Sequence, residues 1–155
     1  MGTLLHACLV LHITGIVLLA GTTLMNYIIS RQFWSYIEID RNRAIVINSA
    51  TLSFARLTGI GGALTILTGI AMVAIFHGAV SSQLWFRVKM ALVLLIILNA
   101  LLLGAPQTTK LKKILLSGVH KSDRLESVKS RMDLYYAIQL IMFFTIFILS
   151  VFRFN

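Results

Sequence analysis

Acidic residues are scarce in this chain, and none lies inside its long apolar stretches. Only five of the 155 residues are Asp or Glu, and charged residues make up 12% of the chain, roughly half the share that is usual in soluble domains. The single cysteine, Cys8, excludes an intramolecular disulfide and any metal site built from several cysteines. Because no Pro-, Gly- or Ser-rich linker divides the chain, we predict one domain over residues 1–155.

The chain contains four uncharged apolar stretches instead. They cover residues 4–29, 57–76, 90–104 with a neutral extension to 109, and 134–152. About 20 apolar residues are enough for a helix to cross a bilayer. The sequence therefore predicts an all-α polytopic membrane protein, a four-transmembrane-helix bundle with helices at approximately 4–30, 49–78, 84–116 and 122–153. The only proline, Pro106, is expected to kink or end the third helix.

The basic residues gather on one side of the predicted bundle. The link between the first two helices carries four of the 14 Lys and Arg residues, and the link between the last two carries seven. Only Arg87, Lys89 and Arg153 remain for the opposite side. By the positive-inside rule, both links face the cytoplasm and both termini lie outside. We expect the positive charge to meet the lipid bilayer, with no nucleic acid as a partner.

Two ionisable side chains fall inside the predicted spans, His12 in the first and Lys89 near the start of the third. Such groups are costly in hydrocarbon, usually face the bundle interior and usually serve a function. Lys89 and Arg87 could extend to the outer interface, or they could hold an anionic ligand group. His12 could ligate haem iron, form structural hydrogen bonds, or take part in proton or quinol chemistry.

Other candidates carry a weaker signal. His6 and His77 lie level with each other near the outer surface and could ligate a metal or haem. On the second helix, Gly62, Thr65 and Gly69 share one face. Small residues there permit close helix contact, or they leave room for a flat ligand.

Short motifs in three of the helices resemble a known group of membrane proteins. They are Leu11-His12-Ile13-Thr14-Gly15 in the first helix, Arg56-Leu57-Thr58 in the second, and Trp85-Phe86-Arg87-Val88-Lys89 in the third. Together they resemble the HemJ-type protoporphyrinogen oxidases, the CopD-like four-helix proteins and a related group of unassigned function. The chain has Thr58-Gly59 where the HemJ-type proteins usually have Thr-Pro, and Asn99-Ala100 where they usually have Tyr-His.

The resemblance implies a b-type haem bound through His12, a functional Lys89, and a homo-oligomer in the bacterial cytoplasmic (inner) membrane. It also implies oxidation of a porphyrinogen, or electron transfer with quinone, towards a respiratory-chain partner. On this hypothesis His12 and Lys89 are catalytic. The expected cofactor contacts are His12, Lys89, Arg87, Trp85, Gly62, Thr65, Gly69 and Asn99. A polar interior is expected from Thr22, Asn26, Asn99 and Gln139.

A non-enzymatic interpretation stays open beside this one. The chain could be a copper- or ion-handling membrane protein, or a subunit of a larger membrane complex. The CopD-like resemblance favours copper. Thiolate and thioether ligands suit Cu(I), but the six methionines are scattered and Cys8 is the only thiol.

Overall fold

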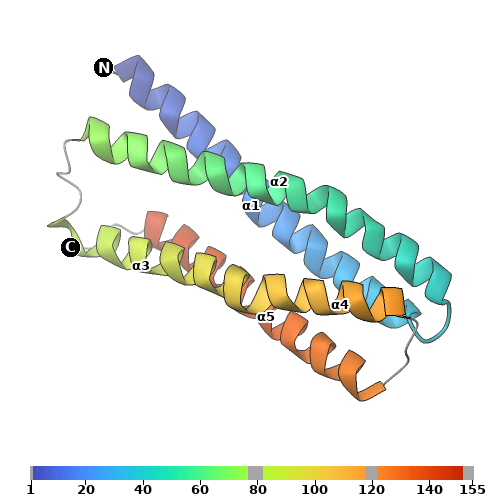
Figure 1. Ribbon diagram of the computed structural model, residues 1–155. Helices are drawn as coiled ribbons and strands as arrows, with labels where there is room; N and C mark the ends of the chain where they lie inside the picture. The colour runs from blue at the N-terminus through green and yellow to red at the C-terminus, as the bar shows by residue number, and fades with distance from the viewer. Residues whose placement is uncertain (1, 77–81, 118–121, 152–155) are drawn as a thin grey trace.

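The computed structural model describes residues 2–76, 82–117 and 122–151. Its helices are α1 (Gly2–Tyr36), α2 (Arg41–Ile75), α3 (Leu84–Asn99), the π-helical segment η2 (Ala100–Gly104), α4 (Ala105–Ser117) and α5 (Ser122–Val151). Because α3, η2 and α4 follow one another without a break, they form one rod antiparallel to α5 (Figure 1). Four helical rods are long and apolar enough to cross a membrane. The predicted four-helix membrane bundle is confirmed.

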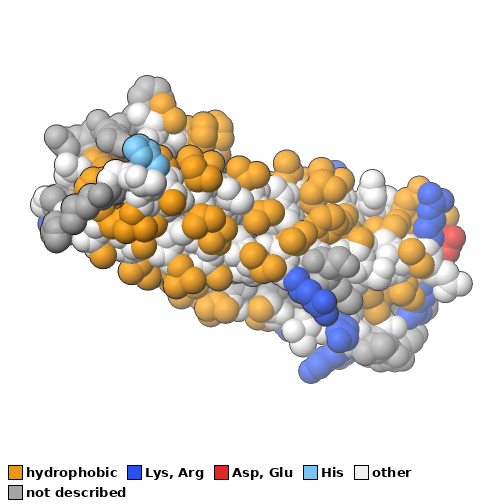
Figure 2. Space-filling view, turned by 90° about the horizontal axis from the view of Figure 1, so that it is seen from above, with side chains coloured by type: hydrophobic (Ala, Val, Ile, Leu, Met, Phe, Trp, Pro, Cys, Tyr) orange, Lys and Arg blue, Asp and Glu red, His pale blue; other side chains and the backbone are white. Residues whose placement is uncertain are grey.

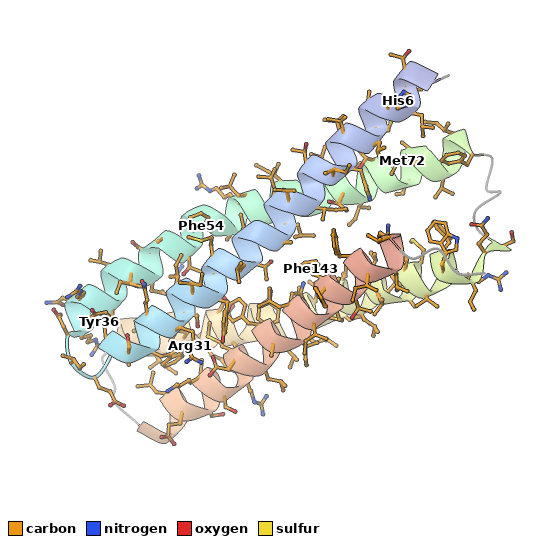
Figure 3. The ribbon with its side chains drawn as sticks, turned by 180° about the vertical axis from the view of Figure 1, so that it is seen from behind. His6, Arg31, Tyr36, Phe54, Met72 and Phe143 are labelled. Atoms are coloured by element: carbon orange, nitrogen blue, oxygen red, sulfur yellow. The ribbon has the colours of Figure 1, made fainter. Side chains whose placement is uncertain are left out.

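The two ends of the bundle differ in chemistry. α1 begins and α5 ends at the same end (Figure 1), which we call the terminal end. His6 and Met72 lie towards the terminal end, whereas Arg31 and Tyr36 lie towards the opposite one (Figure 3). Lys and Arg gather at that opposite, basic end, while apolar side chains cover the middle of the visible face (Figure 2). The positive-inside rule assigns the basic end to the cytoplasm.

α1 and α2 are longer than the sequence predicts, and the polar link between them is only residues 37–40. Each helix has 35 residues, or about 52 Å at 1.5 Å per residue. α1 continues because Phe33 and Trp34 keep its inner face buried beyond the apolar stretch. α2 starts early because the Asp40 side chain accepts a hydrogen bond from the backbone N–H of Arg43 at 3.0 Å, which is an N-cap.

Small residues bring α1 and α2 into backbone contact. A Cβ atom at Gly15 would lie 2.6 Å from Thr65 Oγ1 and 3.0 Å from the carbonyl oxygen of Gly61. One at Gly61 would lie 2.7 Å from the backbone nitrogen of Leu19. Such close approach is how helices associate in lipid, where burial of apolar surface does not drive association.

The same contact sets an antiparallel register along the pair. Gly15 packs on Thr65, Thr58 Oγ1 donates to Thr22 Oγ1 at 2.8 Å, and His12 meets Thr68. Each step along α1 is matched by an equal step backwards along α2. The pair therefore runs in one fixed alignment from the middle of the membrane to its outer half.

The hydrophobic core lies near the basic end. We call it the basic-end cluster; its buried members are Phe33, Trp34, Ala44, Leu111, Val128, Met132 and Tyr136. Between the two helix pairs, the rings of Tyr27 and Tyr136 lie 5.8 Å apart, and Arg41 Nη2 donates to the carbonyl of Leu115 at 3.0 Å. Many apolar side chains of the spans are instead exposed to the surroundings of the bundle, as expected where lipid is the solvent.

The third rod passes through Pro106 rather than ending there. The α-helical hydrogen-bond pattern is interrupted just before it, over η2. Gly104, the last residue of η2, packs so closely on Tyr135 that a Cβ would lie 2.9 Å from the ring. π-helical segments commonly occur where the regular hydrogen-bond pattern of a helix is disturbed. Pro106 causes such a disturbance because it has no backbone N–H.

The close contact at Gly61 predicts a sharp difference between two glycines on α2. Gly61→Ala should lower the free energy of unfolding by about 1–3 kcal/mol, because the added methyl meets backbone atoms of α1. Gly59→Ala should be neutral or stabilising by up to about 1 kcal/mol, because nothing lies within 4 Å of its Cβ position and Ala is the better helix former. Thermal unfolding in detergent, followed by circular dichroism, compares the two. Equal melting temperatures would contradict the proposed helix contact.

Candidate functional site

His12 lies on the inner side of α1, in the half of the bundle nearer the terminal end. Its Nδ1 atom is 2.9 Å from Thr68 Oγ1 on α2. Gly69, the next residue of α2, lies under the ring, since a Cβ there would be 3.4 Å from His12 Cε1. The imidazole is half-buried. The α1–α2 register thus holds the ring between a hydroxyl and a residue without a side chain.

The hydrogen bonds of Thr68 indicate which ring nitrogen carries the proton. The Thr68 hydroxyl donates its only proton to the carbonyl of Leu64 at 2.6 Å. It can therefore only accept from His12, so Nδ1 carries the hydrogen. A neutral imidazole protonated on Nδ1 has its lone pair on Nε2. The ring also interacts with the backbone of Thr65, one helical turn before Gly69 on α2.

Lys89 is held by the other helix pair. Its Nζ donates to Ser150 Oγ on α5 at 3.0 Å, and Ser150 in turn donates to the carbonyl of Ile146 at 2.7 Å. Lys89 is half-buried near the start of α3. The structure therefore brings the two ionisable groups of the spans into the same half of the bundle, on separate helix pairs.

The remaining predicted cofactor contacts are spread along the bundle. Gly69 touches the His12 ring, whereas Thr65 packs on Gly15, and the Cβ position of Gly62 is 3.8 Å from Leu19. These contacts hold α1 against α2.

The predicted contacts on α3 lie at two depths. At its start, Trp85 Nε1 donates to Gln83 Oε1 at 2.6 Å, and Arg87 is exposed. Asn99 lies ten residues beyond Lys89 in the same helix, about 15 Å further along it.

Asn99 belongs to a second polar group at the centre of the bundle. Its Nδ2 donates to Gln139 Oε1 at 2.7 Å and to the carbonyl of Tyr135 at 3.1 Å. Asn99 and Gln139 are buried, as are Thr22 and Asn26. The predicted polar interior is therefore present, although Asn99 joins α3 to α5 there rather than reaching His12.

The weaker metal candidates do not assemble into a cluster where the structure can be described. His6 is exposed in the first turns of α1, and His77 lies outside the described residues. Over residues 2–76, 82–117 and 122–151, no three His, Cys, Asp or Glu side chains come together as metal ligands. Cys8 is a half-buried free thiol.

Sequence reasoning missed the two hydroxyls that hold the ionisable groups, Thr68 and Ser150. Thr68 is adjacent to Gly69 and three residues after Thr65, so the sequence indicates that it lies on or beside the same face of the helix. Its pairing with His12 depends on the register of α1 against α2, which the sequence pattern left open. The contact of Ser150 with Lys89 depends in the same way on the register of α3 against α5.

Comparison with known proteins identifies no relative of this chain: no family model matches it, and neither a curated protein nor a solved structure is significantly similar to it.

The Thr68 contact predicts a measurable preference in the His12 ring. In the wild-type protein, the ¹⁵N spectrum of the ring should show a protonated Nδ1 and an unprotonated Nε2. Thr68→Val removes the acceptor with little change in volume, so the two tautomers should become mixed. Thr14→Val is the control, because the Thr14 hydroxyl bonds only the carbonyl of Val10 in its own helix, at 2.9 Å. A wild-type ring protonated on Nε2 would contradict the assignment.

Proposed function

We propose that this protein is a haem-b-binding redox protein of the bacterial cytoplasmic membrane, with His12 as the axial ligand. The observation that carries the proposal is the orientation of the His12 imidazole, whose Nδ1–H is held by Thr68 at 2.9 Å while Nε2 keeps its lone pair. Histidines that ligate metals almost always donate their other ring N–H in this way, which fixes the ring and raises its basicity. His12 and Thr68 therefore fit a haem iron by the chemistry of their donor atoms.

The charges of the outer half support an anionic partner. Haem carries two propionates, and Lys89 and Arg87 are the basic residues of the third rod nearest His12 in depth. No Asp or Glu lies in the four apolar stretches to compete for Lys89. Its Nζ donates to the neutral hydroxyl of Ser150, a contact that leaves the positive charge of the ammonium uncancelled. In low dielectric, such a charge binds an anion strongly.

When bound, the haem would supply one-electron transfer, and this chain would position it. Thr68 holds the imidazole in the ligating tautomer, Gly69 leaves the ring its space, and Lys89 supplies the charge for a carboxylate. A porphyrinogen or a quinol is the class of electron donor that we infer. A homo-oligomer and a respiratory-chain partner complete the proposal.

The test is the absorption spectrum of protein purified from haem-replete cells. The wild-type protein should show a Soret band that shifts on reduction, and His12→Ala should lose it, because no iron ligand replaces Nε2. His6→Ala is the matched control on the same helix, since His6 is exposed near the helix start. His120→Ala is a second control, since His120 belongs to the basic link between the last two predicted helices. Both controls should keep the band. A wild-type protein without a Soret band, or equal haem in all variants, refutes the ligand assignment.

A further inference from the structure

A small cavity lies at the basic end, where all four rods meet. Its volume is about 20 Å³, and it is lined by Ser30 of α1, Thr51 of α2, Thr108 of α4 and Met132 of α5. Roughly 10–15 Å³ is enough for one water molecule. Part of the basic-end cluster, including Met132, forms its apolar wall.

The polar wall of this cavity carries groups without partners. Ser30 is only 6% exposed, and its Oγ atom has no hydrogen-bond partner among the residues that the structure describes. Asn48 and Thr51, which line the cavity from α2, form no side-chain hydrogen bond with the described residues. Thr108 donates to the carbonyl of Gly104 at 3.0 Å, which leaves its oxygen able to accept. A buried polar group without a partner costs about 1–3 kcal/mol, and this cost applies to Ser30. Asn48 and Thr51 are half-buried and Thr108 is exposed, so they offer further polar contacts to a ligand that satisfies Ser30.

Charge decides what that ligand is. None of the described residues that line the cavity is acidic, and the end of the bundle that contains it is basic. A bound cation would be repelled and would lack a counter-charge. An anion would find hydroxyls and an amide but no Lys or Arg in the wall. A neutral molecule that both donates and accepts hydrogen bonds fits, and the volume limits it to the size of water.

We propose that this cavity binds a single water molecule, shared by Ser30, Asn48, Thr51 and Thr108. The water joins the α1–α2 pair to the α4–α5 pair, because Ser30, Asn48 and Thr51 belong to the first pair and Thr108 to the second. It gives the two pairs a second polar connection, in addition to the hydrogen bond from Arg41 to the carbonyl of Leu115. This inference is independent of haem, since His12 and Lys89 lie in the other half of the bundle.

Radiolytic hydroxyl labelling of the full-length protein in detergent tests the proposal, because bound water generates radicals that oxidise the side chains beside it. Met132 lines the cavity and should be labelled in the wild type. In Ser30→Val, which fills the cavity, labelling of Met132 should fall about threefold or more, because the water is displaced. Ser35→Val is the matched control on α1; Ser35 is exposed and bonds only the carbonyl of Gln32. There the labelling should stay at the wild-type level.

Met142 is the internal reference, because it is buried to nearly the same extent as Met132 but does not line the cavity. Its labelling should be the same in all variants. Thr51→Leu fills the cavity from α2 and replaces Ser30→Val if that variant does not fold, as judged by circular dichroism. Met132 labelling that is unchanged in the filled variant overturns the proposal. So does a melting temperature that rises with sodium chloride but not with choline chloride, which would identify a cation.

Discussion

The contact between Gly15 and Gly61 determines where the other groups on α1 and α2 lie. Since neither residue has a side chain, the two backbones approach until the Cβ position of Gly61 is 2.9 Å from the carbonyl oxygen of Gly15. At that distance a shift along the helix axis would bring side chains into collision. The register that results puts His12 beside Thr68 and Thr22 beside Thr58. His12, the candidate iron ligand, is thus positioned by a packing contact about one helical turn away from it.

Lipid imposes a second constraint, on the two hydroxyls that contact the ionisable groups. With no water in the hydrocarbon, Thr68 donates to the carbonyl of Leu64 and Ser150 to that of Ile146, each within its own helix. Each hydroxyl proton is then committed, and only the oxygen lone pairs remain. These hydroxyls can therefore only accept, from the His12 ring in one helix pair and from the Lys89 ammonium in the other. The tautomer of His12 follows from the backbone geometry of α2.

The sequence predicts the parts of this structure that depend on one helix at a time. The spans, the common side of the termini, and the depth of His12 and Lys89 follow from hydropathy, charge and helical rise. The partners Thr68 and Ser150 do not, because they depend on the registers between helices, which are set by close contacts such as that of Gly15 on Thr65 and Gly61. The extension of α1 to Tyr36 was missed for a different reason. Polar residues such as Arg31 and Gln32 look like the end of a membrane span, yet Phe33 and Trp34 continue the buried face.

The two ends of the bundle are suited to different tasks. At the basic end the basic-end cluster holds all four rods together, and Tyr27 packs against Tyr136 between the pairs. Towards the terminal end, His12 bonds Thr68 within the α1–α2 pair, and Lys89 bonds Ser150 within the α3–α5 pair. A ligand that engaged both groups would therefore bridge the pairs. Its binding energy would act on their relative position, while the core at the basic end would resist any movement there. We therefore expect the affinity for such a ligand to depend on the packing of the basic end. His12 and Lys89 are not members of the basic-end cluster, so this coupling would act through the relative position of the two pairs.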